Sequence, residues 1–263
     1  MRKTKKVIVI LSGGLDSSTL AYFAAKNPGA YLKNKVYTLT FDYGQRHRRE
    51  ILCARKISTR IRAVSNKIIK FDLTLWGGSA LTDSKVSVPL SGRLPDTLAN
   101  RKSLKVPVTY VPARNTIFLA FALSYAETIG AEEIYIGVNS IDYSGYVDCR
   151  PAFIRKFTEL AKLATASGVK GKGIKIKTPL LKLTKADIVK LGERLHVPWQ
   201  DTWSCYLGGR QPCGLCDSCR LRLKGFMEAG TKDPLSYKRL PDYYKKWLAT
   251  TQVLHYGKNK TAN

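Results

Sequence analysis

Short apolar segments of strand length alternate with segments of helical period through about the first 190 residues. Apolar residues at every third or fourth position indicate helices, whereas short runs rich in Val, Ile and Tyr are typical of strands. Strands separated by helices favour a parallel sheet covered on both faces, that is, a doubly wound α/β fold. The predicted strands are KKVIVILS, KVYTLTFDYG, NKIIKFDL, EEIYIGV and IKIKTPLL, and the predicted helices cover 16–26, 50–61, 115–131, 152–166 and 184–195.

Such a fold predicts where a ligand binds. Open parallel sheets bind their ligands beyond the carboxyl ends of the strands. We therefore expect one crevice, lined by the loops that follow Leu11, Phe41, Val138 and Lys177.

Two helices carry more detailed predictions. The helix over 50–61 should turn its apolar side chains toward the core. The strongly apolar helix that starts near position 115 has Asn115 as its predicted N-cap, because a short amide side chain can accept from the first free N–H groups. The inward-facing residues of the first of these helices are predicted to be Ile51, Leu52, Ile57 and Ile61.

The composition limits the class of protein. With 263 residues, of which 44% are hydrophobic, the chain can form one large domain with a small appendage. The apolar run near the N-terminus, Val7 to Leu11, is shorter than the core of a signal peptide, and the longest apolar runs are too short for a membrane helix. We expect a cytoplasmic protein that does not associate with membranes.

The charge is strongly positive. The 45 Lys and Arg residues outnumber the 19 Asp and Glu residues, which gives a net charge of +26. Such a surface attracts phosphate-rich or acidic partners: nucleotides, nucleic acid or an acidic protein. A solvated basic surface without any such partner has the same composition, so the charge alone identifies no function.

The first predicted strand runs directly into Ser-Gly-Gly-Leu-Asp-Ser, followed by a helix. The glycines permit close approach of the backbone, and the free N–H groups of a helix N-terminus attract anions, so we expect a phosphate-binding loop rather than a simple capped turn. The loop matches neither the Walker A nor the G-x-G-x-x-G pattern. Asp16 would repel a phosphate by itself, but it could hold Mg²⁺ or orient a donor. The residues predicted to bind ATP are Leu11, Ser12, Gly13, Gly14, Leu15, Asp16, Ser17, Ser18, Thr19, Leu20 and Ala21.

Four of the six cysteines lie within fifteen residues: Cys205, Cys213, Cys216 and Cys219. In a cytoplasmic chain, such clustering indicates a metal site more often than disulfides. An iron–sulfur cluster uses the same ligands. Since no other feature points to redox chemistry, we predict a structural, four-coordinate Zn²⁺ site. Cys53 is predicted to be a core residue.

The predicted domains are an α/β domain over 1–200, a zinc-binding subdomain over 201–230 and a basic C-terminal tail or helix over 231–263. Within the first, residues 76–110 are rich in glycine and proline. They should form a long irregular lid, because loops of that length in compact domains are usually functional.

The segments LSGGLDSST, TFDYGQRH, VPARNTIFL, IGVNSIDYSGYVDCR, TPLLKLTKADI and SCYLGG, followed by CGLCDSCRLR, occur in this order. Together they resemble the 7-cyano-7-deazaguanine synthase family of the PP-loop ATP pyrophosphatases, over residues 6–226. The resemblance implies a PP-loop, adenine nucleotide alpha hydrolase-like fold. It also implies ATP-dependent conversion of 7-carboxy-7-deazaguanine and ammonia to the nitrile through acyl adenylate and amide intermediates, with bound zinc and a homodimer.

The resemblance also suggests roles for single residues. Lys185 and Arg114 are predicted to contact phosphates and, with Asp16, to be catalytic; a surface ion pair is the alternative for each cation. The loops after the second and fourth strands should bind the deazaguanine. Asp142 or Asp148 could accept from its N1–H and exocyclic amine. The predicted substrate-binding residues are Tyr43, Gln45, Arg46, His47, Asp142, Tyr143, Ser144, Tyr146, Asp148 and Arg150.

The chain departs from the family pattern at two positions near the predicted substrate pocket. Val147 stands where the family usually has proline, and Ala152 where it usually has an acidic residue. Other functions therefore stay open at this point. They are a ligase that passes the adenylated deazaguanine to an amine on a protein or nucleic acid, a PP-loop enzyme that modifies tRNA directly, and a nucleotide-binding protein without catalysis.

Overall fold

The computed structural model describes residues 4–27, 33–93, 106–139 and 145–258, with side chains up to Thr251. Its described strands form one parallel sheet in the order β3-β2-β1-β4-β5. In the register of the sheet, Val9 of the central strand pairs with Thr38 on one side and Tyr135 on the other. The doubly wound α/β prediction is confirmed. The strands are β1 (Lys6–Ile10), β2 (Lys35–Asp42), β3 (Ser65–Lys70), β4 (Glu133–Tyr135) and β5 (Lys175–Lys177).

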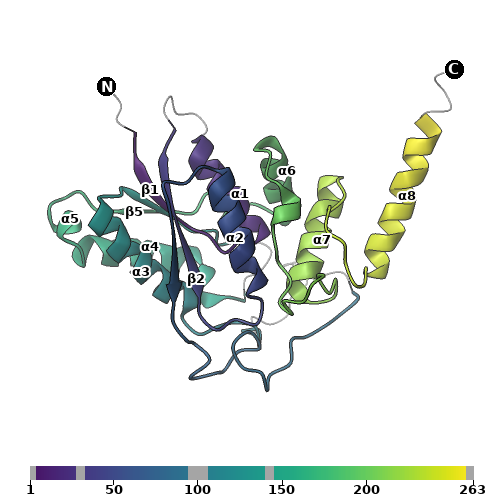
Figure 1. The fold of residues 1–263 in the computed structure, drawn as a ribbon, viewed down its shortest axis with the longest axis horizontal. Coiled ribbons are helices and arrows are strands. Elements are labelled where there is room, and N and C mark those ends of the chain that lie inside the picture. The colour runs from purple at the N-terminus through teal and green to yellow at the C-terminus, as the bar shows by residue number, and fades with distance from the viewer. Residues whose placement is uncertain (1–3, 28–32, 94–105, 140–144, 259–263) are drawn as a thin grey trace.

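Helices cover both faces of this sheet (Figure 1). Because side chains alternate along a strand, Ile8 and Ile10 face one core and Val7 and Val9 the other. The first core is closed by α3 (Arg114–Ile129) and α4 (Pro151–Leu163), and the second by α1 (Leu15–Lys26), α2 (Arg49–Arg60) and α6 (Lys185–Arg194). The short α5 (Ala166–Val169) follows α4.

Two of the detailed helix predictions are wrong. Leu52 is 58% exposed, since it lies one position beyond Ile51 and therefore about 100° away from the buried face of α2. Asn115 lies inside the first turn of α3 and is not its cap; the N-cap is Ala113, which has φ of 53°. The Asp148 carboxylate accepts a hydrogen bond from the Asn115 N–H at 2.9 Å, so a residue distant in sequence satisfies this helix end.

The C-terminal part packs against the second core. The helix α7 (Asp217–Ala229) lies beside α6, and α8 (Asp242–Lys258) contacts α7 and runs along the edge of the molecule, yellow in Figure 1. Two short 3₁₀ helices, Val147–Cys149 and Trp199–Asp201, connect the longer elements. Among the described residues, no helix has both the length and the apolar character needed to cross a membrane.

The segment predicted as a lid is irregular where it is described, over 76–93 and 106–110. It packs closely on the rest of the chain: Leu81 is fully buried, and the Arg46 guanidinium donates to the carbonyls of Asp83 and Val86. Further along, Leu90 forms an antiparallel bridge with Cys216. The described parts of the segment therefore connect the sheet to the cysteine region, and residues 94–105 lie outside the described residues.

Candidate active site

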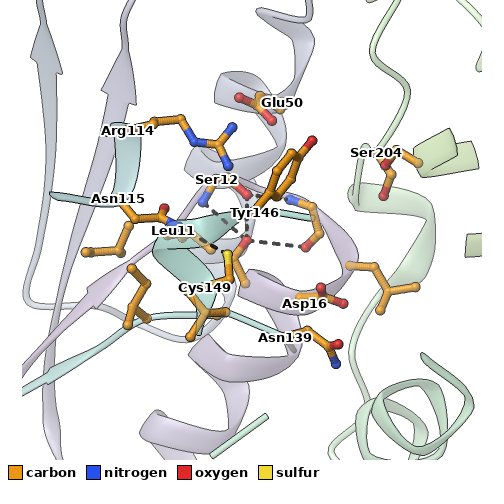
Figure 2. A pocket seen from close by; sticks show the side chains of 18 of the residues that line it. Leu11, Ser12, Asp16, Glu50, Arg114, Asn115, Asn139, Tyr146, Cys149 and Ser204 are labelled. Atoms are coloured by element: carbon orange, nitrogen blue, oxygen red, sulfur yellow. Dashed lines mark hydrogen bonds between the residues drawn. The ribbon is translucent and has the colours of Figure 1, made fainter. Parts of the chain in front are cut away.

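A cavity of about 250 Å³ opens at the carboxyl ends of β1, β2 and β4, where the fold predicts a ligand site. Segments far apart in sequence form its walls: the loop after β1, the N-termini of α3 and α6, the residues that follow β2 and β4, and one side of α7. Figure 2 shows side chains from several of these elements turned toward a common space.

The loop between β1 and α1 depends on Gly13. Its φ of +85° favours glycine, and a Cβ there would collide with the Glu50 carbonyl oxygen and the Ala54 amide nitrogen of α2. The Ser12 and Gly13 N–H groups each donate to Ser17 Oγ at 3.2 Å, and the Ser12 and Ser17 hydroxyls are 2.9 Å apart. Backbone N–H groups and hydroxyl donors thus converge at the positive end of α1.

Asp16 in the first turn of α1 forms an ion pair with Lys185 in the first turn of α6, with both carboxylate oxygens within 2.9 Å of the ammonium nitrogen. A capping box holds the start of α6: the Thr184 Oγ1 accepts from the Asp187 N–H at 3.1 Å, and the Asp187 carboxylate accepts from the Thr184 N–H at 3.1 Å. The helix N-termini of α1 and α6 therefore bring a carboxylate and a cation together in the cavity wall.

Arg114 at the start of α3 contributes a second cation. Its Nη1 donates to the Tyr43 hydroxyl at 3.4 Å, and its guanidinium carbon lies 5.9 Å from the Phe118 ring centroid and 6.0 Å from that of Tyr146. These distances are at the limit of cation–π attraction. Burial raises the pKa of Tyr43 to about 12, so its hydroxyl stays neutral and can accept from Arg114 at physiological pH.

The four clustered cysteines are all buried, and their sulfur atoms lie within 4.8 Å of one another. In a tetrahedral zinc site with bonds of about 2.3 Å, neighbouring sulfurs are about 3.8 Å apart; the Cys213 and Cys219 sulfurs are 3.9 Å apart. The Cys213 N–H donates to the Cys205 sulfur at 3.3 Å, and the Cys216 N–H to the Cys213 sulfur at 3.2 Å. Since N–H donors favour thiolates, these residues fit a four-coordinate metal ion.

The metal site and the loop after β1 are in direct contact. Between them, the Trp203 N–H donates to the Gly13 carbonyl at 2.9 Å, and the Trp203 indole N–H donates to the Cys205 carbonyl at 3.0 Å. The Arg49 guanidinium of α2 lies 4.7 Å from the indole centroid. The residues just before the cysteines are therefore part of the cavity rim.

Comparison with known proteins now identifies the family. The sequence model of the queuosine biosynthesis protein QueC matches residues 6–230. The 7-cyano-7-deazaguanine synthase of Trichodesmium erythraeum is 50% identical over 230 residues, which cover 88% of this chain and 99% of the relative. The corresponding enzymes of Nostoc sp. (strain PCC 7120) and Acaryochloris marina are 52% and 53% identical, with 89% and 88% of this chain and 98% and 99% of the relatives covered.

The chain belongs to the QueC family. QueC proteins of this kind are 7-cyano-7-deazaguanine synthases of queuosine biosynthesis, and the predicted family, enzyme class and activity are confirmed. QueC membership also implies that ATP is used.

The cavity includes the three residues predicted to be catalytic in this QueC chain, namely Asp16, Lys185 and Arg114. Of the eleven residues predicted to bind ATP, those at the start of the loop and of α1 line the cavity, whereas Thr19, Leu20 and Ala21 are fully buried in the helix behind it. The lining residues of this group are Leu11, Ser12, Gly14, Leu15, Asp16 and Ser17. Ser18 is fully buried, and Gly13 packs against the backbone of α2 behind the loop.

Among the predicted substrate-binding residues, Tyr43, His47 and Tyr146 line the cavity. Asp142, Tyr143 and Ser144 lie outside the described residues.

The structure does not bring the other four substrate-binding candidates into the described cavity lining. The Gln45 amide holds the turn after β2, since its Oε1 accepts from the Tyr43 N–H and its Nε2 donates to the Phe41 carbonyl. The Arg46 guanidinium donates to the Asp83 carbonyl of the irregular segment, and Arg150 is exposed at the N-cap of α4.

The buried Asp148 carboxylate holds the start of α3. It is 6% exposed, and its carboxylate accepts from the Asn115 N–H. Next to it, burial raises the pKa of Cys149, a cavity-lining residue, to about 12. The Cys149 thiol therefore stays protonated at neutral pH, and the Asn115 amide donates to its sulfur at 3.3 Å.

Several lining residues were missed. Glu50 lies beside the predicted His47, with its Oε1 3.3 Å from His47 Nε2 and 3.1 Å from Gln45 Nε2. Tyr206 packs on His47 with ring centroids 5.9 Å apart, and its hydroxyl is 3.3 Å from that of Tyr146. The sequence offered one signal for each residue: Glu50 lies three positions after His47 of the GQRH segment, and Tyr206 directly follows Cys205. The other missed lining residues with polar side-chain atoms are Asn115, Asn139, Cys149, Trp203, Ser204, Ser218 and Arg222.

Proposed function

We propose that the cavity binds Mg²⁺-ATP with its phosphates at the loop after β1, and that it uses ATP twice to convert a carboxylate into a nitrile. The observation that carries this proposal is the Asp16–Lys185 pair, which lies in the cavity wall at the N-terminus of α1. A cation beside free N–H groups favours phosphate binding, and a carboxylate at the same place suits Mg²⁺.

In the first half-reaction, a carboxylate oxygen of 7-carboxy-7-deazaguanine attacks the α-phosphorus of ATP. The bond to the β-phosphate oxygen breaks, pyrophosphate leaves and an acyl adenylate forms. The hydroxyls of Ser12 and Ser17, together with the backbone N–H groups in the first turn of α1, are placed to stabilise the departing pyrophosphate. Lys185 and Arg114 neutralise charge that develops on the phosphates.

Ammonia then attacks the acyl carbon. The carbon–oxygen bond to AMP breaks, a proton is lost and the primary amide remains. The second half-reaction repeats the activation: the amide oxygen attacks the α-phosphorus of a second ATP, pyrophosphate leaves, and loss of AMP together with both N–H protons gives the carbon–nitrogen triple bond. Two ATP molecules thus remove the two carboxylate oxygens, one on each AMP.

The deazaguanine ring needs a flat apolar surface and polar groups at its edge. Tyr43, Phe118, Tyr146 and Tyr206 supply aromatic side chains in the cavity wall. Beside them, the pair of His47 and Glu50 offers groups that can accept from the ring or transfer a proton, which supports this cavity as the binding place of the base as well as of ATP.

The fit of the four-cysteine cluster supports Zn²⁺ as its ion. With four sulfur ligands no coordination position is open, so we assign the ion a structural role. The homodimer, ammonia as the nitrogen donor and an acidic or nucleic-acid partner for the basic surface remain predictions.

The two departures from the family pattern do not favour another acceptor. Val147 is 37% exposed and Ala152 lies on the exposed side of the first turn of α4; neither lines the described cavity. Because these side chains face outward, they leave the reacting groups unchanged.

The test combines purified protein, Mg²⁺-ATP and 7-carboxy-7-deazaguanine, with and without ammonia. We expect two AMP and two pyrophosphate per nitrile when ammonia is present, measured by chromatography and mass spectrometry. Formation of ADP, or an adenylated base that reacts only with a protein or RNA amine, would contradict the proposal.

A further inference from the structure

Helix α7 packs tightly on α6 at Gly225. A Cβ built on Gly225 would lie 2.5 Å from Lys185 Cγ, 3.0 Å from Lys185 Cβ and 3.2 Å from the Lys185 carbonyl carbon. The 2.5 Å contact would force atoms to move, and the other two are tight; all three atoms belong to the base of the Lys185 side chain or to its backbone rather than to the flexible end. Glycine at this position thus lets α7 lie directly on the aliphatic stem of Lys185.

This contact bears on the cavity because the far end of the same side chain carries the ion pair. Lys185 Nζ is 2.8 Å from one oxygen of Asp16 and 2.9 Å from the other, and only 13% of the Lys185 side chain is exposed. A long side chain otherwise occupies several rotamers. With its stem confined by α7 and its head held by Asp16, Lys185 loses most of this freedom.

Helix α7 is itself firmly anchored. Its N-cap is Cys216, with Cys219 in the first turn, so two metal-ligand candidates fix its start. In its middle, the buried Arg222 makes two hydrogen bonds to the buried carboxylate of Asp233, at 2.6 and 3.0 Å. A surface fixed at two places can confine a flexible lysine, whereas a loose helix would move aside.

We propose that Gly225 is a positioning residue: by its lack of a side chain it allows anchored α7 to fix the Lys185 ammonium against Asp16 in the cavity. The inference rests on the proposed function only for the role of Lys185 on phosphate. The effect of Gly225 acts through Lys185 and should vanish when the lysine is absent.

The experiment compares Gly225→Ala with the wild-type chain and with Gly209→Ala as control, because a Cβ at Gly209 would meet its nearest atom at 3.7 Å. A displacement of a catalytic group by about 1 Å lowers turnover by about 100-fold. We expect a kcat loss of that order for Gly225→Ala, with an unchanged KM for the deazaguanine, and wild-type values for Gly209→Ala.

A direct readout needs no turnover. Brief acetylation followed by peptide mass spectrometry measures how accessible the Lys185 amine is, and we expect faster labelling of Lys185 in Gly225→Ala, with other lysines unchanged. This readout remains valid if the wild-type chain cleaves no ATP, so it separates failure of this inference from failure of the proposed function. Unchanged Lys185 labelling would overturn the inference.

A double-mutant cycle with Lys185→Ala completes the test. If the two residues act as one unit, adding Gly225→Ala to Lys185→Ala lowers residual turnover no further. An equal loss in both backgrounds would overturn the proposal. If Gly225→Ala alone does not fold, removal of the Lys185 stem should restore the melting transition and metal content; failure of both variants to fold would also count against it.

Discussion

Two of the walls of the cavity are held in place by different interactions. The PP-loop wall, residues 11–17, continues directly from the central strand: Leu11 is fully buried, and its N–H donates to the Leu39 carbonyl of β2 at 2.9 Å. The α7 wall, formed by Ser218, Leu221 and Arg222, lies outside the sheet and depends on the four cysteines and on the Arg222–Asp233 pair.

This difference suggests that one wall carries the reacting groups and the other holds them in position. The PP-loop wall holds Asp16 and the donors that we propose bind phosphate, and apolar burial together with the hydrogen bonds of a parallel sheet keeps it in place. The α7 wall rests on ligand bonds and a buried ion pair, which fail completely when one partner is lost. Changes to the α7 wall should therefore act mainly on stability and positioning, and changes to the PP-loop wall mainly on chemistry.

The largest expected effect is that of removing the metal. Binding of structural zinc contributes about 10 kcal/mol or more to the folding free energy of small zinc-binding units. Chelation or Cys216→Ser should therefore strip the metal and lower amide-exchange protection in 213–229, while 7–26 keep theirs. Hydrogen exchange with mass spectrometry measures both. Cys53→Ser is the control, because Cys53 is a buried cysteine outside the cluster. Metal-free protein with full protection in α7 would contradict this.

Asp16→Asn tests the PP-loop wall. The substitution removes the charge that pairs with Lys185, and we expect AMP formation to fall about 1,000-fold, which corresponds to about 4 kcal/mol of transition-state stabilisation. The melting temperature should fall less than in Asp233→Asn, since asparagine keeps a polar side chain of similar size beside Lys185 and this pair is less buried than the Arg222–Asp233 pair. Asp242→Asn, at an exposed carboxylate on α8, is the matched control. Unchanged AMP formation in Asp16→Asn would remove this wall from the reaction.

Asp233→Asn tests the ion pair that supports α7. Breaking a buried pair leaves an uncompensated charge and costs about 3–5 kcal/mol. Arg222 is 2% exposed and also donates to Thr202 Oγ1 at 2.7 Å, so it cannot turn to solvent. We expect the melting temperature to fall by about 10 °C. Glu159→Gln, which breaks an exposed pair with Lys156, should shift it by far less. Equal shifts would show that the buried pair is not specially important.

Thr184→Ala has the smallest expected effect. It removes the side-chain cap of α6, which is worth about 1 kcal/mol. Because Lys185 follows directly, a frayed first turn should also lower kcat a few-fold, in contrast to Thr250→Ala on α8. Calorimetry and steady-state kinetics together measure the two effects. A variant that loses stability but keeps the wild-type kcat would show that the cap does not position Lys185.

The sheet and the PP-loop wall could be predicted because their signals are local. Alternation of apolar segments, the glycines and Asp16 all lie within short windows, and Thr184 with Asp187 forms a capping motif. The clustered cysteines were equally visible. These features depend on neighbours in the sequence, so the sequence is sufficient to find them.

The rest depends on contacts between distant segments. Asp148 had the chemistry of a base-binding group, but its carboxylate satisfies the start of α3, thirty-three residues earlier in the chain. Glu50 and Tyr206 join the cavity only because α2 and the cysteine region meet beside His47. Leu52 is a different case: the helical period already places it about 100° from Ile51, and only its hydrophobicity suggested burial.

The central claim is that both carboxylate oxygens leave on AMP after attack at the α-phosphorus of ATP. The most direct measurement uses 7-carboxy-7-deazaguanine labelled with ¹⁸O in both carboxylate oxygens, with mass spectrometry of the nucleotides and pyrophosphate formed. We expect one ¹⁸O in each of the two AMP molecules per nitrile and none in pyrophosphate. Label released into water or found in free phosphate, with ADP as the nucleotide product, would contradict it.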